Sequence, residues 1–213
     1  MKTEKICHCF GAGEYFGSPA ETEKADMVIV ADGGLKVTEK YGISPDFVIG
    51  DFDSLGAVPE NENTTVLPVE KDTTDMFEAI KKGAEEGCTV FHIYGGTGGR
   101  LDHTLANIQH LKYFAEKGLR LYLYGDGYII TAVKDGELTL KGSKGGYVSV
   151  FSLSDISEGV SLKGLKYELS DYTLDNSFPL GVSNEFTGEE AHISVKNGTL
   201  AVYFTYKKGT VFI

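Results

Sequence analysis

The sequence lacks the features of several large classes of protein. No apolar run in its 213 residues approaches the roughly 20 residues that a membrane-spanning helix needs, so we expect no membrane segment. Lysine and arginine number 20 against 31 aspartates and glutamates, and no concentrated basic segment offsets the net charge of −11. Because a negative chain repels the nucleic-acid backbone, we expect no nucleic-acid partner.

Cysteine is also scarce. The three cysteines, Cys7, Cys9 and Cys88, form no C-x-x-C pair, and a zinc site needs about four ligands. Cys7 and Cys9 alternate with His8 in a strand-like stretch, so they should point to one face and pack as small, reduced hydrophobic residues. This apolar stretch is too short and too early for a secretory signal, which favours a cytoplasmic protein.

The first part of the chain alternates strand and helix signals. Continuous apolar strands separated by helices imply a parallel sheet that is covered on both faces. We therefore expect a Rossmann-like α/β domain over residues 1–127. The expected strands are 5–10, 27–31, 47–49, 89–94 and 119–124, and the expected helices are 35–41, one around 76–84 and one around 105–115.

From about Tyr128 helical periodicity disappears and short β-type runs follow one another. We expect an antiparallel sandwich or barrel over residues 128–213, and we assign the sandwich. Asn197-Gly198 is a strong hairpin signal between the last two runs, because a type I′ turn needs positive φ at both central residues. The expected strands are 128–133, 137–140, 147–153, 165–169, 191–195 and 200–206.

Carboxylates and glycines follow several of the expected parallel strands. Ligands of open α/β sheets bind beyond the carboxyl ends of the strands, so these residues are candidates for a site. Asp51 and Asp53 follow one strand in the segment GDFDS, and two such hard oxygen ligands could hold Mg²⁺. The alternative is that they are simple turn residues. Their place beside other acidic strand ends favours the metal site.

The segment 71–75 (KDTTD) directly precedes an expected helix. Asp72, Thr73 or Thr74 is expected to be the helix N-cap, and an acidic residue such as Asp75 suits the first turn of a helix. Asp75 could instead be a further carboxylate near the metal. The spacing leaves both interpretations open.

The segment 95–102 (GGTGGRLD) lies between a strand and a helix. Its glycines would let the backbone approach an anion, and Arg100 could bind phosphate oxygens bidentately. Asp102 could cap the helix as well as bind. The segment matches neither G-x-G-x-x-G nor a Walker A loop, and no Ser-His-Asp or Cys-His arrangement indicates acyl transfer. Acidic ligands, glycine loops and one arginine suit phosphoryl-type transfer.

Together these motifs resemble the thiamine pyrophosphokinase family, and they occur in the family's order over most of the chain. The resemblance implies transfer of a pyrophosphoryl group from ATP to thiamine, which releases AMP and needs Mg²⁺. It also implies a homodimer whose composite active sites combine the N-terminal domain of one subunit with the C-terminal domain of the other. The matching stretches are 31–34 (ADGG), 50–54 (GDFDS), 71–75 (KDTTD), 95–103 (GGTGGRLDH) and 183–186 (SNEF).

The resemblance also assigns residue roles. Some family members place a tryptophan against thiamine, and this chain has none, so a phenylalanine or tyrosine must serve, with Phe178 and Phe186 as candidates. The implied metal ligands and catalytic carboxylates are Asp51, Asp53 and Asp75, with Arg100 also catalytic; the nucleotide contacts are Asp32, Gly33, Gly98, Arg100 and Asp102; the thiamine contacts are Asp75, Ser183 and Asn184.

Two other functions remain open at this stage. A non-catalytic nucleotide-sensing module would bind ATP without turnover, although binding alone does not require so many carboxylates. A kinase that transfers the γ-phosphoryl group to a related alcohol would release ADP instead of AMP.

Overall fold

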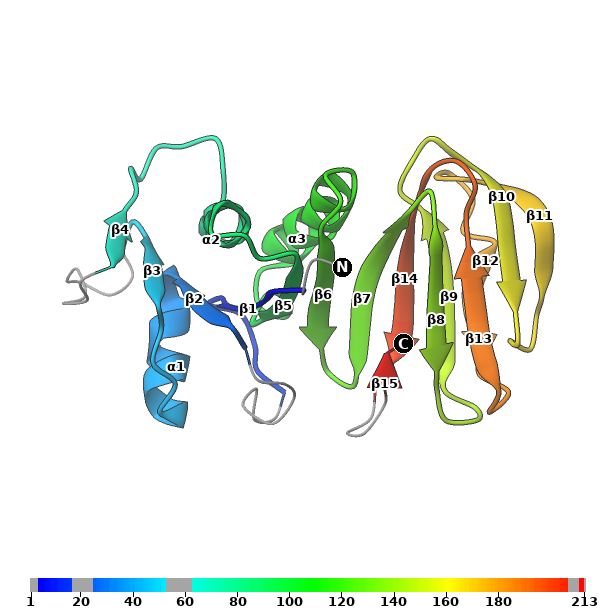
Figure 1. The fold of residues 1–213 in the computed structure, drawn as a ribbon, viewed down its shortest axis with the longest axis horizontal. Coiled ribbons are helices and arrows are strands. Elements are labelled where there is room, and N and C mark those ends of the chain that lie inside the picture. Colours follow the sequence, from blue (N-terminus) through cyan, green and yellow to red (C-terminus); the bar gives the residue numbers. More distant parts are fainter. Residues whose placement is uncertain (1–3, 17–24, 53–62, 207–210, 213) are drawn as a thin grey trace. The chain divides into compact units, whose positions relative to one another are not determined.

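The computed structural model describes residues 4–16, 25–52, 63–206 and 211–212 (Figure 1). The chain divides into two compact units. Unit 1 consists of Met1–His110 and Leu119–Asp126, and unit 2 consists of Leu111–Gly118 and Gly127–Ile213. Within the described ranges, no helix combines the length and the apolar composition needed to cross a membrane.

Unit 1 contains a sheet in which every strand pair is parallel, in the order β6-β5-β1-β2-β3-β4. Each of the expected apolar strands is confirmed to within a residue or two, and its central residues are buried, as in a parallel strand that is covered on both faces. The strands are β1 Ile6–Phe10, β2 Met27–Ala31, β3 Phe47–Gly50, β4 Thr64–Val66, β5 Val90–Tyr94 and β6 Arg120–Gly125.

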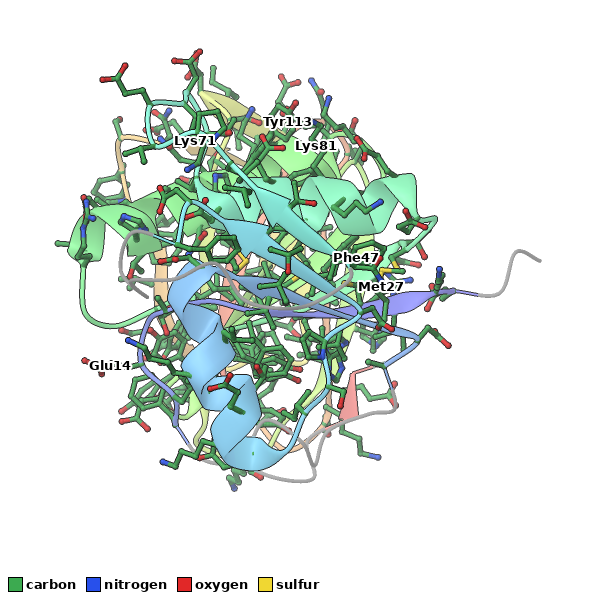
Figure 2. All side chains as sticks on the ribbon, turned by 90° about the vertical axis from the view of Figure 1, so that its left-hand side faces the viewer. Glu14, Met27, Phe47, Lys71, Lys81 and Tyr113 are labelled. Atoms are coloured by element: carbon green, nitrogen blue, oxygen red, sulfur yellow. The ribbon has the colours of Figure 1, made fainter. Side chains whose placement is uncertain are left out.

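The helices of this part of the chain begin where the sequence provides caps. Thr74 is the N-cap of α2, and its Oγ1 accepts a hydrogen bond of 3.1 Å from the Phe77 N–H. Helices α1 and α2 lie on opposite sides of the strands (Figures 1 and 2). The helices are the 3₁₀ turn η2 Asp32–Gly34, α1 Leu35–Tyr41, α2 Asp75–Glu85 and α3 Leu101–Ala115, whose residues to His110 belong to unit 1.

Cys7 and Cys9 are fully buried, and their sulfur atoms lie 3.7 Å apart. A Cβ at Gly83 of α2 would lie 3.2 Å from the sulfur of Cys7 and 2.7 Å from the ring of Phe91, so the glycine allows α2 to pack closely on the sheet. All three cysteines are free. The prediction that Cys7 and Cys9 pack as small hydrophobic residues on one face is therefore confirmed.

The strand pairs within unit 2 are antiparallel. One set of neighbouring strands has the order β12-β9-β14-β7, and a separate five-stranded sheet has the order β11-β10-β13-β8-β15. Burial alternates along β7 with the period of two that a half-buried strand shows. The strands are β7 Tyr128–Lys134, β8 Glu137–Lys141, β9 Tyr147–Ser152, β10 Ile156–Lys163, β11 Leu169–Asp175, β12 Gly181–Glu185, β13 Glu190–Ser194, β14 Thr199–Thr205 and β15 Val211–Phe212.

Two predictions for this part of the chain are wrong. Asn197-Gly198 does not close a hairpin, because β13 pairs with β10 and β8 whereas β14 pairs with β7 and β9. Gly198 has φ of +122°, and the chain bends at this dipeptide. The bend leads from one sheet to the other instead of joining two paired strands. The expected strand 165–169 is replaced by an isolated bridge from Leu165 to Phe186, and the following strand begins at Leu169.

Candidate active site

Unit 1 contains a cavity of about 430 Å³ at the carboxyl ends of β1, β2 and β5. Figure 2 shows Met27 and Phe47 at the amino ends of β2 and β3, with Glu14 and Lys71 toward the opposite edge. The cavity therefore lies where open α/β sheets bind their ligands. Its lining residues are Gly11, Ala12, Gly13, Ala31, Asp32, Thr74, Asp75, Met76, Gly95, Gly96, Gly98, Gly99, Arg100, His103 and Asn107.

Two glycine loops, a first loop at residues 11–13 and a second loop at residues 95–99, form much of this cavity. The Gly13 N–H donates to the Gly95 carbonyl at 2.8 Å, and the Glu14 N–H donates to the Thr97 carbonyl at 2.9 Å. A Cβ at Gly13 would lie 2.5 Å from both of these carbonyl oxygens, so a side chain there would push the loops apart. The lining is therefore largely backbone, which lets a polyphosphate approach closely.

Groups that suit an anion gather at the second loop. Gly98 and Gly99 have φ of +75° and +60°, and the Gly99 N–H donates to Glu14 Oε1 at 3.3 Å. Asp102 accepts from Arg100 Nη2 at 2.6 Å and from Arg100 Nε at 3.2 Å. This contact holds the pKa of the Asp102 carboxyl below its usual range. The Gly99 N–H and the Arg100 guanidinium thus each donate to an acidic side chain, Glu14 and Asp102 respectively. A phosphate could replace these carboxylates as the acceptor.

Asp32 has an unusual backbone conformation. It follows β2 with φ of +42°, which non-glycine residues seldom adopt. A Cβ at Gly50 would lie 3.0 Å from the Cα of Asp32, so the end of the neighbouring strand β3 must approach Asp32 without a side chain. Strain of this kind is concentrated at functional sites. Asp32 lines the cavity and lies beside the end of β3, where Asp51 directly follows Gly50.

Asp51 and Asp75 share one cation. The Lys71 Nζ lies 3.3 Å from Asp51 Oδ2 and 3.0 Å from Asp75 Oδ1. Burial raises the pKa of Asp75, and the negative charges of Asp51 and Asp32 raise it further, against the opposing effect of Lys71. The structure therefore brings together three of the predicted site residues, Asp32, Asp51 and Asp75.

Carboxylate oxygens are the type of ligand that a hard divalent cation such as Mg²⁺ binds. Within the described residues, no group of three or more histidines, cysteines, aspartates and glutamates closes to a metal-binding arrangement. Asp53, the other predicted ligand, lies outside the described residues. Even so, Asp51 and Asp75 already hold the Lys71 ammonium between them. These oxygen donors can therefore face a common positive charge, as Mg²⁺ ligands must.

The predicted thiamine contacts Ser183 and Asn184 belong to unit 2. Ser183 is exposed with φ of +59°, and its N–H donates to Ser149 Oγ at 3.0 Å. Asn184 is buried: its Oδ1 accepts from the Tyr167 and Glu185 N–H groups at 2.9 Å each, and its Nδ2 donates to the Tyr167 carbonyl at 2.6 Å. The amide of Asn184 thus holds the backbone around Tyr167.

The two aromatic candidates differ in their surroundings. Phe186 is 2% exposed, and a Cβ at Gly142 would lie 2.3 Å from its ring, so Phe186 is a core residue. Phe178 is 63% exposed. Tyr167 is 60% exposed and is presented by the contacts of Asn184, which gives unit 2 a further exposed ring.

Sequence reasoning missed the first glycine loop and two charged residues. The segment 11–13 directly follows an apolar strand, and this position could have identified it by the same rule that singled out the other strand ends. Glu14 left no such signal, and Lys71 was identified only as the first residue of the segment 71–75, with no role of its own. The Gly99 N–H that Glu14 accepts from lies 85 residues away, and Asp51, one of the two carboxylates that contact Lys71, lies 20 residues away, so spacing could not predict these two contacts.

Comparison with known proteins agrees with this geometry. Residues 19–123 match the thiamin pyrophosphokinase catalytic domain, and residues 133–200 match the thiamin pyrophosphokinase vitamin B1 binding domain. The chain is 28% identical over 186 residues to thiamine pyrophosphokinase of Bacillus subtilis, which covers 84% of this chain and 87% of that protein.

Solved structures give the same result. The crystal structure of thiamine pyrophosphokinase from Bacillus subtilis has a TM-score of 0.83 at 26% identity, over 95% of this chain and 100% of that one. The enzyme from Geobacillus thermodenitrificans has a TM-score of 0.81 at 25% identity, over 97% and 100%. Since the two family matches together span most of the sequence, the chain belongs to the thiamin pyrophosphokinase family.

Proposed function

We propose that the protein is a thiamine pyrophosphokinase that transfers an intact pyrophosphoryl group from ATP to the hydroxyl of thiamine. The products are thiamine diphosphate and AMP. One observation carries the proposal: Arg100 and the carboxylates of Asp32 and Asp75 line the same cavity as the glycine loops, at the carboxyl ends of the parallel strands. Matches to both family domains support the choice of thiamine as the acceptor.

The proposed reaction forms a bond between the thiamine oxygen and the β-phosphorus of ATP and breaks the bond from that phosphorus to the oxygen of the α-phosphate. The glycine loops and Arg100 bind and orient the polyphosphate, which is the main task of the protein in phosphoryl-type transfer. Asp32, which lines the cavity, and Asp102, which pairs with Arg100, are proposed as further nucleotide contacts. One of the clustered aspartates accepts the hydroxyl proton.

The metal site is also a proposal. Asp51, Asp53 and Asp75 would hold Mg²⁺, which would supply charge neutralisation on the transferred group. The contact of Asp51 and Asp75 with one ammonium supports this assignment. The same carboxylates would attract thiamine, which is a cation.

Residues 128–213, which make up most of unit 2, are proposed to form a β-sandwich domain for thiamine binding and dimerisation. The Rossmann-like domain 1–127 is proposed to bind the nucleotide. Ser183 is proposed to contact thiamine through its exposed side chain, and Asn184 to act by holding the adjacent backbone.

We further propose a homodimer with composite active sites. Unit 2 exposes several large apolar side chains near β12, among them Phe178, Leu180 and Val182, and an apolar surface of this kind suits a second copy of the chain. In solution the mass should be about twice that of one chain. Val182→Asp should shift the population toward the monomer in light scattering, whereas a wild-type monomer would contradict the dimer.

Incubation with ATP, MgCl₂ and thiamine followed by product identification tests the proposed function. AMP with thiamine diphosphate is the expected outcome. ADP with thiamine monophosphate would indicate a γ-phosphoryl kinase, and ATP binding without any turnover would indicate a sensing module.

A further inference from the structure

Lys71 is held by three segments of unit 1. Its ammonium lies 3.0 Å from Asp75 at the start of α2, 3.3 Å from Asp51 at the end of β3, and 3.2 Å from the carbonyl of Pro68. The side chain is 14% exposed. Lys81, on the same side of the sheet in Figure 2, is 52% exposed and pairs with Glu78 of its own helix. Lys71 is thus a partly buried residue that connects separate segments through its ammonium, whereas Lys81 is a surface lysine.

The ammonium offsets a concentration of negative charge. The carboxylates of Asp32 and Asp51 act electrostatically on Asp75, and all three are partly removed from water. Burial by itself would lower the pKa of Lys71, but Asp75 and Asp51 outweigh it and raise that pKa. Like charges in a partly buried site repel strongly unless a counterion lies between them. Lys71 supplies that counterion in the protein without ligands.

The same two carboxylates are the proposed ligands of Mg²⁺. A divalent cation bound between Asp51 and Asp75 would lie within a few ångströms of the present position of the ammonium. Two cations at that separation repel each other, so only one can occupy the position. The lysine side chain is long and flexible, so it can move away when the metal arrives.

We propose that Lys71 is an internal counterion that competes with the divalent cation for Asp51 and Asp75 and is displaced when that cation binds. The inference rests on the proposed function, which assigns these carboxylates to the metal. Lys71 stabilises the metal-free protein and weakens metal binding. The two effects are linked, because whatever stabilises the metal-free state lowers the affinity for the metal.

Lys71→Gln and Lys71→Met test the proposal, with Lys81→Met as the matched control. Both Lys71 variants remove the charge, and Lys71→Gln keeps a polar group if the Met variant fails to fold. Thermal unfolding is recorded in EDTA and in MgCl₂, and binding of MgCl₂ alone is measured by calorimetry. The Lys71 variants should unfold at a lower temperature in EDTA and bind Mg²⁺ roughly five- to tenfold more tightly than wild type. Lys81→Met should match wild type in both measurements.

Unchanged or weaker Mg²⁺ binding by Lys71→Gln would overturn the proposal. The wild-type protein separates this failure from failure of the proposed function. If wild type binds Mg²⁺ and produces AMP while Lys71→Gln binds Mg²⁺ no more tightly, only the role of Lys71 is wrong. If wild type neither binds Mg²⁺ nor produces AMP, the proposed function fails and the competition proposal fails with it.

Discussion

The Asn184 side chain forms a paired contact with the backbone of Tyr167: its Nδ2 donates to the Tyr167 carbonyl at 2.6 Å, and its Oδ1 accepts from the Tyr167 N–H at 2.9 Å. Both residues belong to unit 2, and Tyr167 is in a segment outside the regular strands. Asn184, which the family resemblance assigns to thiamine, therefore has a structural role that depends on both ends of its amide.

Asn184→Ala should destabilise the protein by about 1–3 kcal/mol, because it removes three hydrogen bonds and leaves backbone groups around Tyr167 without those partners. Urea unfolding measures the change. The neighbouring Ser183→Ala should stay within about 0.5 kcal/mol of wild type, since its contact with Ser149 uses the backbone N–H. Equal stability of the two variants would contradict this role for Asn184.

Asp75→Asn should lower turnover by at least about a hundredfold while the fold is retained, because it removes a proposed metal ligand and catalytic carboxylate. Steady-state kinetics and circular dichroism measure the two effects. Glu78→Gln, one turn further along α2, should retain activity because Glu78 contacts Thr73 and Lys81 rather than the cavity. Near-normal activity of Asp75→Asn would return Asp75 to a role in the first helical turn.

Arg100→Lys should lower kcat at least about tenfold, because an ammonium cannot reproduce the planar two-point contact that the guanidinium makes with Asp102 and would make with phosphate. Arg120→Lys is the control, because Arg120, the first residue of β6, pairs with Glu4 and does not line the cavity. Kinetics close to wild type for Arg100→Lys would show that a point charge suffices there.

His8 should make the protein sensitive to acid. Burial lowers its pKa from 6.5 to about 4, so between these values the unfolded chain binds a proton that the folded protein excludes. The stability that the protein owes to an uncharged His8 is fully present above pH 6.5, and it is lost as the pH falls toward 4.

Between pH 7 and pH 5, wild type should therefore lose about 2 kcal/mol more stability than His8→Leu. Leucine suits the site because the buried His8 Nε2 has no hydrogen-bond partner among the described residues. Urea unfolding at several pH values measures the difference, with the exposed His192→Leu as control. Parallel pH profiles for wild type and His8→Leu would contradict the account.

The sequence predicted the elements whose formation depends on local pattern. Apolar runs such as β2 and β5 and the Thr74 cap of α2 follow from residues that are neighbours in the chain. Pairing between distant segments did not follow. Asn197-Gly198 specifies a turn, but which sheet each flanking strand joins depends on partners such as β8 and β9.

The candidate site shows the same division. The acidic and glycine-rich strand ends could be identified because a parallel sheet brings its carboxyl ends to one edge. The ion pairs of Lys71 could not, since they depend on the conformation of the segment between β4 and α2. The positive φ of Asp32, which lies close to Gly50 of another strand, likewise left no signal in the local sequence.

The most direct measurement of the central claim follows the phosphorus atoms of ATP. ATP labelled at the γ-phosphorus and ATP labelled at the α-phosphorus are each incubated with the protein, MgCl₂ and thiamine, and the products are separated. The account predicts that the γ label appears in thiamine diphosphate and that the α label appears in AMP. Recovery of the γ label in thiamine monophosphate, with the α label in ADP, would contradict transfer of an intact pyrophosphoryl group.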